Sequence, residues 1–192
     1  MKKSFAIVGM VCLSTLGAVA QDMPRMEAFV GYTYVRFNKI TGAPPVSANG
    51  GGGQLVYNLN TWLGLVGDVG VVHNGDIGVA HLDSRFTNFL FGPRLAFRHA
   101  HLTPYFQVLF GGVHASSSGL VNVVPVTIES NQTAFAMTAG GGLDIKLGRH
   151  VSFRPIGLDY YLTRLQNLRR LGDDSQNNLR YTTGFNFTFG AQ

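Results

Sequence analysis

Hydrophobic and polar residues alternate along most of this chain with a period of two, and the 3.6-residue period of an amphipathic helix is nearly absent. The alternation is clearest over residues 178–190. One face there carries Leu179, Tyr181, Thr183, Phe185, Phe187 and Phe189, and the other carries Arg180, Thr182, Gly184, Asn186, Thr188 and Gly190. Such a strand needs an apolar medium on one side and a polar or tightly packed space on the other.

The same pattern predicts eight strands, at residues 26–37, 52–59, 61–72, 85–98, 101–114, 133–146, 151–164 and 178–190. Each is close to the ~9–11 residues with which a tilted strand spans a bilayer. The facing of the first strand is ambiguous, because Phe29 and Val30 compete for its apolar face.

The connections between these strands alternate in length. Long connections cover residues 38–51, 73–84, 115–132 and 165–177, and short ones cover 58–60, 98–101 and 147–150. The long loops therefore fall at one end of the sheet, and the short turns fall at the other with both chain termini. This asymmetry is typical of outer-membrane barrels, which have short periplasmic turns and long outer loops.

The cost of free strand edges in lipid and the small number of charged residues together indicate a closed barrel in a membrane. An open sheet in lipid would expose backbone groups that each cost several kcal/mol. Asp68, Arg94, Asp144 and Arg180 all lie opposite the phenylalanine-rich faces, and charged residues make up only 13% of the chain. A soluble lipocalin-like barrel is the alternative, but so few charges would not cover its exterior. The predicted fold class is all-β, an eight-stranded antiparallel up-and-down transmembrane β-barrel.

The N-terminus reads as an export signal. A basic start and an apolar run over residues 5–13 precede Ala18-Val19-Ala20, the small-residue pattern of a signal-peptidase site. We therefore expect residues 1–20 to be a cleaved signal peptide and 21–192 to form the barrel domain. An uncleaved anchor and lipid attachment at Cys12 are the disfavoured alternatives. Cleavage would leave a chain without cysteine and hence without disulfides.

The sequence gives little support for binding of nucleic acid, phosphate or metal. The formal net charge is +5, but the cations form no basic stripe, so nucleic acid is not an expected partner. The tetraglycine at 50–53 is followed by no Lys-Ser/Thr and no helix, so it is not a phosphate-binding loop. His99 and His101 could coordinate a metal ion, but no third ligand is apparent. We expect neither a metal nor a cofactor.

Several motifs carry a family resemblance. They are TWLGLVGD at 61–68, FGPR at 91–94, LTPY at 102–105, GGGLD at 140–144, RP at 154–155, DY at 159–160 and RYTTGFNFTFG at 180–190. Together they resemble the eight-stranded outer-membrane β-barrel proteins, the OmpA-like transmembrane domains. The resemblance implies insertion into the outer membrane of a Gram-negative cell by the barrel-assembly machinery. We expect a monomer in contact with outer-membrane lipids and lipopolysaccharide. No peptidoglycan-binding domain follows the barrel, so a tether to the cell wall is not expected.

A group of charged residues shares the predicted inward face: Asp68, Arg94, Asp144, Asp159 and Arg180. Buried charges are costly unless they are paired, so we expect a salt-bridge network that plugs the lumen, in preference to separately hydrated charges. Asp68 and Arg94 lie on adjacent strands and are the best candidate pair. Arg154 has the opposite parity to Asp159 and is expected to face lipid, unless Pro155 marks a bulge.

Two weaker sites lie near the long loops. His114 and Ser116 share one face of a strand, where the imidazole could activate the hydroxyl, and Glu129 follows. Outer-membrane lipid A deacylases have a broadly similar arrangement, but a polar strand end is the favoured interpretation, and we expect no enzyme activity. Arg164, Arg169 and Arg170 could meet lipopolysaccharide phosphates, although a soluble loop is the simpler interpretation.

Three functions remain open at this point. The favoured one is a structural protein, or a scaffold whose four outer loops contact surface ligands. A narrow passive channel of the porin type is the second, and a lipid A-modifying hydrolase is the third.

Overall fold

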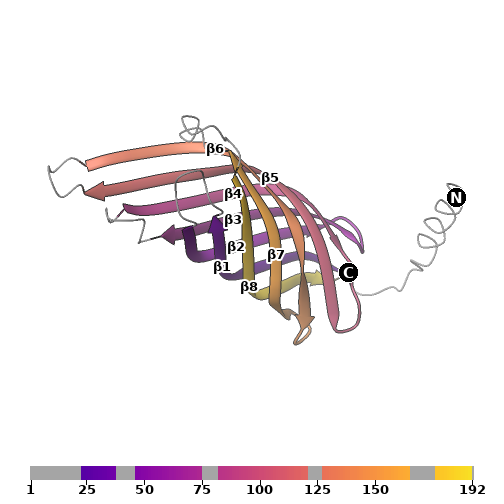
Figure 1. Cartoon of the computed structure of the whole chain (residues 1–192). Coiled ribbons are helices and arrows are strands. Elements are labelled where there is room, and N and C mark those ends of the chain that lie inside the picture. The colour runs from indigo at the N-terminus through magenta and orange to yellow at the C-terminus, as the bar shows by residue number, and fades with distance from the viewer. Residues whose placement is uncertain (1–22, 38–45, 75–81, 121–126, 165–175, 192) are drawn as a thin grey trace, which may run out of the picture.

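The computed structural model describes residues 23–37, 46–74, 82–120, 127–164 and 176–191. Their strands are β1 (Pro24–Phe37), β2 (Val46–Asn58), β3 (Leu63–Asn74), β4 (Leu82–Ala96), β5 (Leu102–Leu120), β6 (Thr127–Lys146), β7 (Val151–Arg164) and β8 (Gln176–Ala191). Each strand pairs antiparallel with its chain neighbour, and β8 returns to pair with β1 (Figure 1). The predicted eight-stranded up-and-down barrel is confirmed.

The two ends of the barrel differ. Short connections at residues 59–62, 97–101 and 147–150 lie at one end, here called the turn end. The start of β1 and the finish of β8 lie at the same end, where Pro24 pairs with Ala191. The opposite end, here called the loop end, is where the strands lead into the longer connections. In the described part of the chain, no helix is long and apolar enough to cross a membrane.

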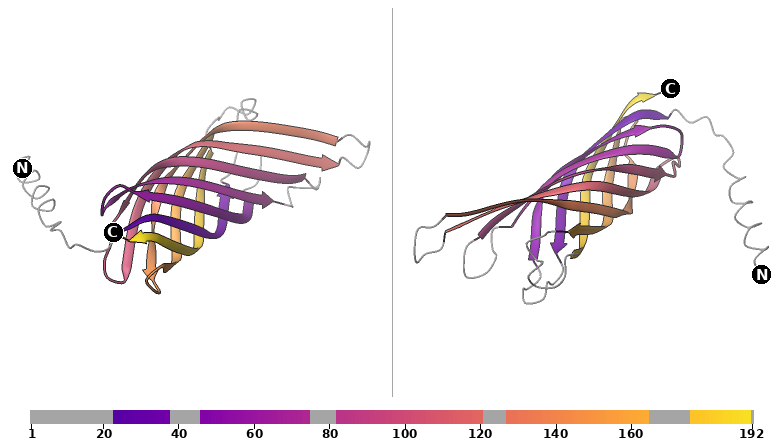
Figure 2. Two further views of the ribbon diagram at one scale, coloured as in Figure 1. Left: turned by 180° about the vertical axis from the view of Figure 1, so that it is seen from behind. Right: turned by 90° about the horizontal axis from the view of Figure 1, so that it is seen from above.

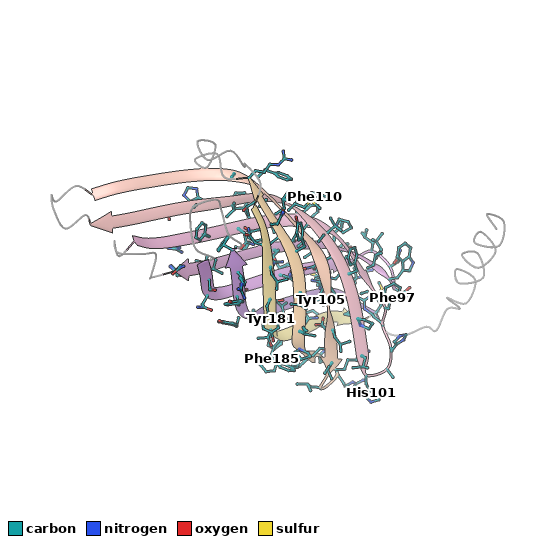
Figure 3. The ribbon with its side chains drawn as sticks, viewed as in Figure 1. Phe97, His101, Tyr105, Phe110, Tyr181 and Phe185 are labelled. Atoms are coloured by element: carbon teal, nitrogen blue, oxygen red, sulfur yellow. The ribbon has the colours of Figure 1, made fainter. Side chains whose placement is uncertain are left out.

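Side chains alternate between the two surfaces of the barrel wall. Tyr105 and Phe110 on β5 illustrate this, with exposed fractions of 6% and 46% (Figure 3). On β1 the ambiguity of the sequence is resolved, because Phe29 points inward at 2% exposure and Val30 points outward at 63%. Large apolar side chains cover the exterior and most charged ones are enclosed, which contradicts the lipocalin-like alternative.

The strands on one side of the barrel are longer than predicted. β5 and β6 continue to the pair Leu120–Thr127, so much of the expected loop at 115–132 is a hairpin extension. Figure 2 shows β4, β5 and β6 projecting beyond the other strands at the loop end. The sequence there lacks the two-residue hydrophobic alternation from which the strands were predicted.

β2 also begins earlier than predicted. Its tetraglycine, Gly50–Gly53, pairs with Val30–Thr33 of β1 and with Val69–Val72 of β3. Its first two glycines, predicted in the connection at 38–51, therefore belong to the strand. The absence of side chains hid the alternation at these positions.

The interior has two zones. Charged and amide side chains occupy the inward positions nearer the turn end of most strands. An apolar core lies mainly on their loop side: Val35 and Phe37 follow Glu27 on β1, and Leu109 and Val113 follow Gln107 on β5. Phe86 packs against this core and contacts Phe37 at 5.0 Å between ring centroids.

Candidate functional site: the charged interior

The charged residues of the interior balance one another. Four carboxylates and four guanidiniums face the lumen or its mouth: Glu27, Asp68, Asp144 and Asp159 with Arg94, Arg98, Arg154 and Arg180. Arg98 is the most exposed of the paired groups, at 11% of its side chain. These eight residues, with the amides of Gln54 and Gln107, are here called the lumenal network. All five residues that the sequence placed inward belong to it.

Arg180 joins distant parts of the wall. Its Nε and Nη2 lie 3.0 and 2.8 Å from Oδ2 of Asp159, its neighbour in register on β7. Its Nη1 lies 2.9 Å from Oδ1 of Asp68 on β3, a strand that is not adjacent to β8. One guanidinium therefore binds two carboxylates and ties two sides of the barrel together.

The predicted Asp68–Arg94 pair is wrong in detail. Both side chains point inward, but the register places Asp68 opposite Leu90, four residues from Arg94 on β4. That offset is roughly 13 Å along a strand, too far for an ion pair. Gln54 bridges the two residues instead: its Nε2 donates to Asp68 at 2.8 Å, and its Oε1 accepts from Arg94 at 2.5 Å.

Arg154 does not face lipid, because the bulge proposed as the exception is present. The register of β7 shifts between Arg154 and Gly157 against β8, and the register of β6 and β7 shifts between Leu143 and Ile145. The extra residue reverses the parity, and Arg154 is fully buried. Its Nε and Nη2 donate to the two oxygens of Asp144 at 2.7 and 3.1 Å.

Two aromatic rings line the network. The Cζ atoms of Arg94 and Arg154 lie 4.3 and 4.4 Å from the centroid of the Tyr105 ring, and that of Arg154 lies 4.1 Å from the Phe29 ring. Such contacts place positive charge over aromatic faces in a dehydrated interior. Sequence reasoning missed Phe29, because Val30 next to it fits an apolar face equally well.

The network continues to the mouth of the turn end. Arg98 Nη2 lies 2.6 Å from Oε1 of Glu27 and also donates to Asn58. Asn186 links Glu27 to Asp144, with Nδ2 at 2.9 and 3.4 Å from the two carboxylates. Glu27, Gln54 and Gln107 were missed by sequence reasoning. Their inward parity, shared with charged residues on neighbouring strands, was the available signal.

The arrangement suits closure of the lumen. Each carboxylate is held by at least two donors, and among the described residues the only buried side-chain polar atoms without a partner are Thr138 Oγ1 and Asn186 Oδ1. Within the described ranges there is also no group of three or more metal-ligating side chains, so His99 and His101 gain no further ligand. The site holds its charges in place by hydrogen bonds.

The candidate catalytic residues are not assembled. His114 and Ser116 do share the outer face of β5, but His114 pairs in register with Thr133, whose Oγ1 lies 3.0 Å from its Nδ1. Glu129 pairs with Ser118 and precedes Thr133 by four residues on β6, roughly 13 Å from the level of His114. The register therefore does not place Glu129 beside His114, where a carboxylate would orient the imidazole.

Some of the remaining predicted residues lie outside those that the structure describes. Arg164 is exposed at the loop end of β7, whereas Arg169 and Arg170 lie outside the described residues. The predicted signal peptide at 1–20 and its cleavage site also lie outside them.

A closed barrel with an apolar exterior and a charge-balanced interior defines a class, the transmembrane β-barrels. The chain belongs within that class to the outer membrane protein beta-barrel domain family, whose model matches residues 4–192. This confirms the resemblance drawn from the sequence and indicates an outer-membrane location.

Solved structures share the fold. The attachment invasion locus protein Ail of Yersinia pestis superposes with a TM-score of 0.62 at 17% identity, over 87% of this chain and 100% of Ail. Neisserial surface protein A gives 0.64 at 11% identity, over 85% and 97%. The N-terminal barrel domain of Pseudomonas aeruginosa OprF gives 0.50 at 15% identity, over 85% and 98%. A comparison with curated proteins gives no match.

Proposed function

We propose that this chain is a structural or surface-contact protein of the outer membrane, with a lumen plugged by its own side chains. The observation that carries the proposal is the lumenal network, in which Arg180 alone joins Asp68 and Asp159 across the barrel. An eight-stranded barrel has an interior just wide enough for side chains to fill. With the lumen occupied, the parts left for interaction are the exterior and the loop end.

The apolar core gives the plug a second layer. An ion that crossed the lumen would have to displace hydrogen-bonded charges and then pass Val35, Phe37, Leu109 and Val113. Dehydration in such an apolar constriction opposes conduction. We therefore favour a closed barrel over the narrow passive channel.

The proposal also assigns an orientation and surroundings to the two ends of the barrel. The turn end would face the periplasm and the loop end the exterior, after export by the N-terminal segment and insertion by the barrel-assembly machinery. The four outer connections would then contact surface ligands, and the barrel would be a monomer among outer-membrane lipids and lipopolysaccharide. No catalysis is assigned to His114, Ser116 and Glu129, because the register separates Glu129 from His114.

Conductance tests the closed lumen. The purified chain, refolded and inserted into planar bilayers, is expected to show no steady single-channel conductance, because the network and the apolar core fill the interior. A wide-lumen porin in the same bilayers is the positive control. Steady conductance with a defined unit size would contradict the proposal and favour the narrow channel.

A further inference from the structure

Backbone hydrogen bonds tie the connections of the turn end to the ends of neighbouring strands. Ala96 donates to the carbonyl of Trp62 at 2.8 Å, and Lys146 donates to that of His101 at 2.9 Å. Thr188 donates to the carbonyl of His150 at 2.9 Å. The second of these bonds places Lys146 beside the turn at 97–101, on the rim where Phe97 and His101 are visible in Figure 3.

Positive groups gather on one part of this rim. The turns at 97–101 and 147–150, with the end of β6, expose two cationic side chains, Lys146 and Arg149, and beside them three histidines. These five residues are here called the cationic rim: His99, His101, Lys146, Arg149 and His150. Among the described residues near this end, the acidic ones are Glu27 and Asp144, which are buried and bonded to Arg98 and Arg154. The cationic rim therefore has no exposed carboxylate beside it in the described structure.

Apolar side chains accompany these cations. Leu147 is 64% exposed, Phe97 47% and Leu102 43%. Basic groups next to exposed apolar ones are typical of the boundary between acyl chains and headgroups, where long cationic side chains reach the phosphates.

We propose that the cationic rim binds the phosphate groups of anionic phospholipids in the leaflet that surrounds the turn end. The turns span only residues 97–101 and 147–150, so their charges cannot project far from the membrane boundary. The same leaflet is therefore the nearest source of anions, ahead of an acidic protein in solution. The inference rests on the membrane insertion contained in the proposed function.

The chain offers a local reporter and a matched control. Trp62 is its only tryptophan and lies on the turn at 59–62, which carries no charged residue. A second reporter, Leu147→Trp in a Trp62→Phe background, lies between Lys146 and Arg149. Both forms are refolded into phosphatidylcholine vesicles that contain either brominated phosphatidylglycerol or brominated phosphatidylcholine, and bromine quenches tryptophans that it contacts.

Tryptophan at position 147 is expected to be quenched more strongly by the brominated anionic lipid than by the zwitterionic one at equal mole fraction. The local preference should be on the order of five-fold for each cation engaged. Adding Lys146→Gln and Arg149→Gln should bring the ratio close to one, and high salt should reduce it. Trp62 in the native chain should show a ratio close to one throughout.

Equal quenching by the two lipids at position 147, or a preference that survives the double substitution, would overturn the inference while leaving the proposed function intact. Absence of quenching by either lipid at both positions would contradict membrane insertion, and with it both proposals.

Discussion

Arg154 shows that the position of a residue in a strand does not by itself determine which side of the wall it faces. Counting in twos from Asp159 places Arg154 outward, yet its guanidinium is fully buried and bonded to both oxygens of Asp144. Pro155 follows it and has no N–H to donate to a neighbouring strand, which suits an irregular position. The bidentate ion pair then supports the inward orientation.

Replacing Arg154 by methionine tests this ion pair. Arg154→Met is expected to lower the free energy of unfolding by about 3–5 kcal/mol, because Asp144 would remain buried without its main partner. Urea unfolding of the barrel refolded in lipid vesicles measures the change. The double variant Arg154→Met with Asp144→Asn should cost clearly less than the single one. A single variant no less stable than the double would show that the pair does not determine stability.

At the scale of the strand, close packing between β6 and β7 depends on glycine. A Cβ atom placed on Gly140 would lie 2.1 Å from the carbonyl oxygen of Leu158 and 2.7 Å from Oδ1 of Asp159. The absence of a side chain therefore lets β7 and the carboxylate of Asp159 approach the wall. A glycine in the turn at 147–150 has no such constraint, since no atom lies within 4 Å of a Cβ on Gly148.

A pair of valine substitutions compares these two glycines. Gly140→Val is expected to destabilise the barrel by about 1–3 kcal/mol or more, because backbone atoms would have to move. Gly148→Val should change stability by less than about 0.5 kcal/mol. The temperature at which the folded electrophoretic band disappears reports both. Equal effects at the two positions would contradict the packing argument.

At the scale of the whole molecule, the closed sheet and the apolar exterior are both suited to a lipid surrounding. The pairing of β1 with β8 removes the free edges that lipid would penalise, and Phe89, Phe91 and Phe185 on the outer surface need an apolar surrounding. Continuous backbone pairing around the wall therefore suits the barrel to an apolar surrounding.

The chain expressed in a Gram-negative host is expected in the outer-membrane fraction. Its folded form should migrate differently on a gel before and after boiling, because a closed barrel resists detergent until it is heated. Fractionation and paired gel lanes measure the two properties. A freely dissolved product whose mobility is independent of heating would contradict the membrane assignment.

The sequence by itself determined the number of strands, their antiparallel order and the facing of most positions. It could do so because a membrane demands an apolar residue at every second position, which a single strand records: β8 needed no neighbour to show that Phe185 faces outward. Only the tertiary structure decided that Asp68 pairs with Arg180, that Arg154 turns inward and that β5 and β6 extend beyond the barrel. These features depend on the register between strands and on bulges, and the pattern within one strand contains no information about its offset from the next.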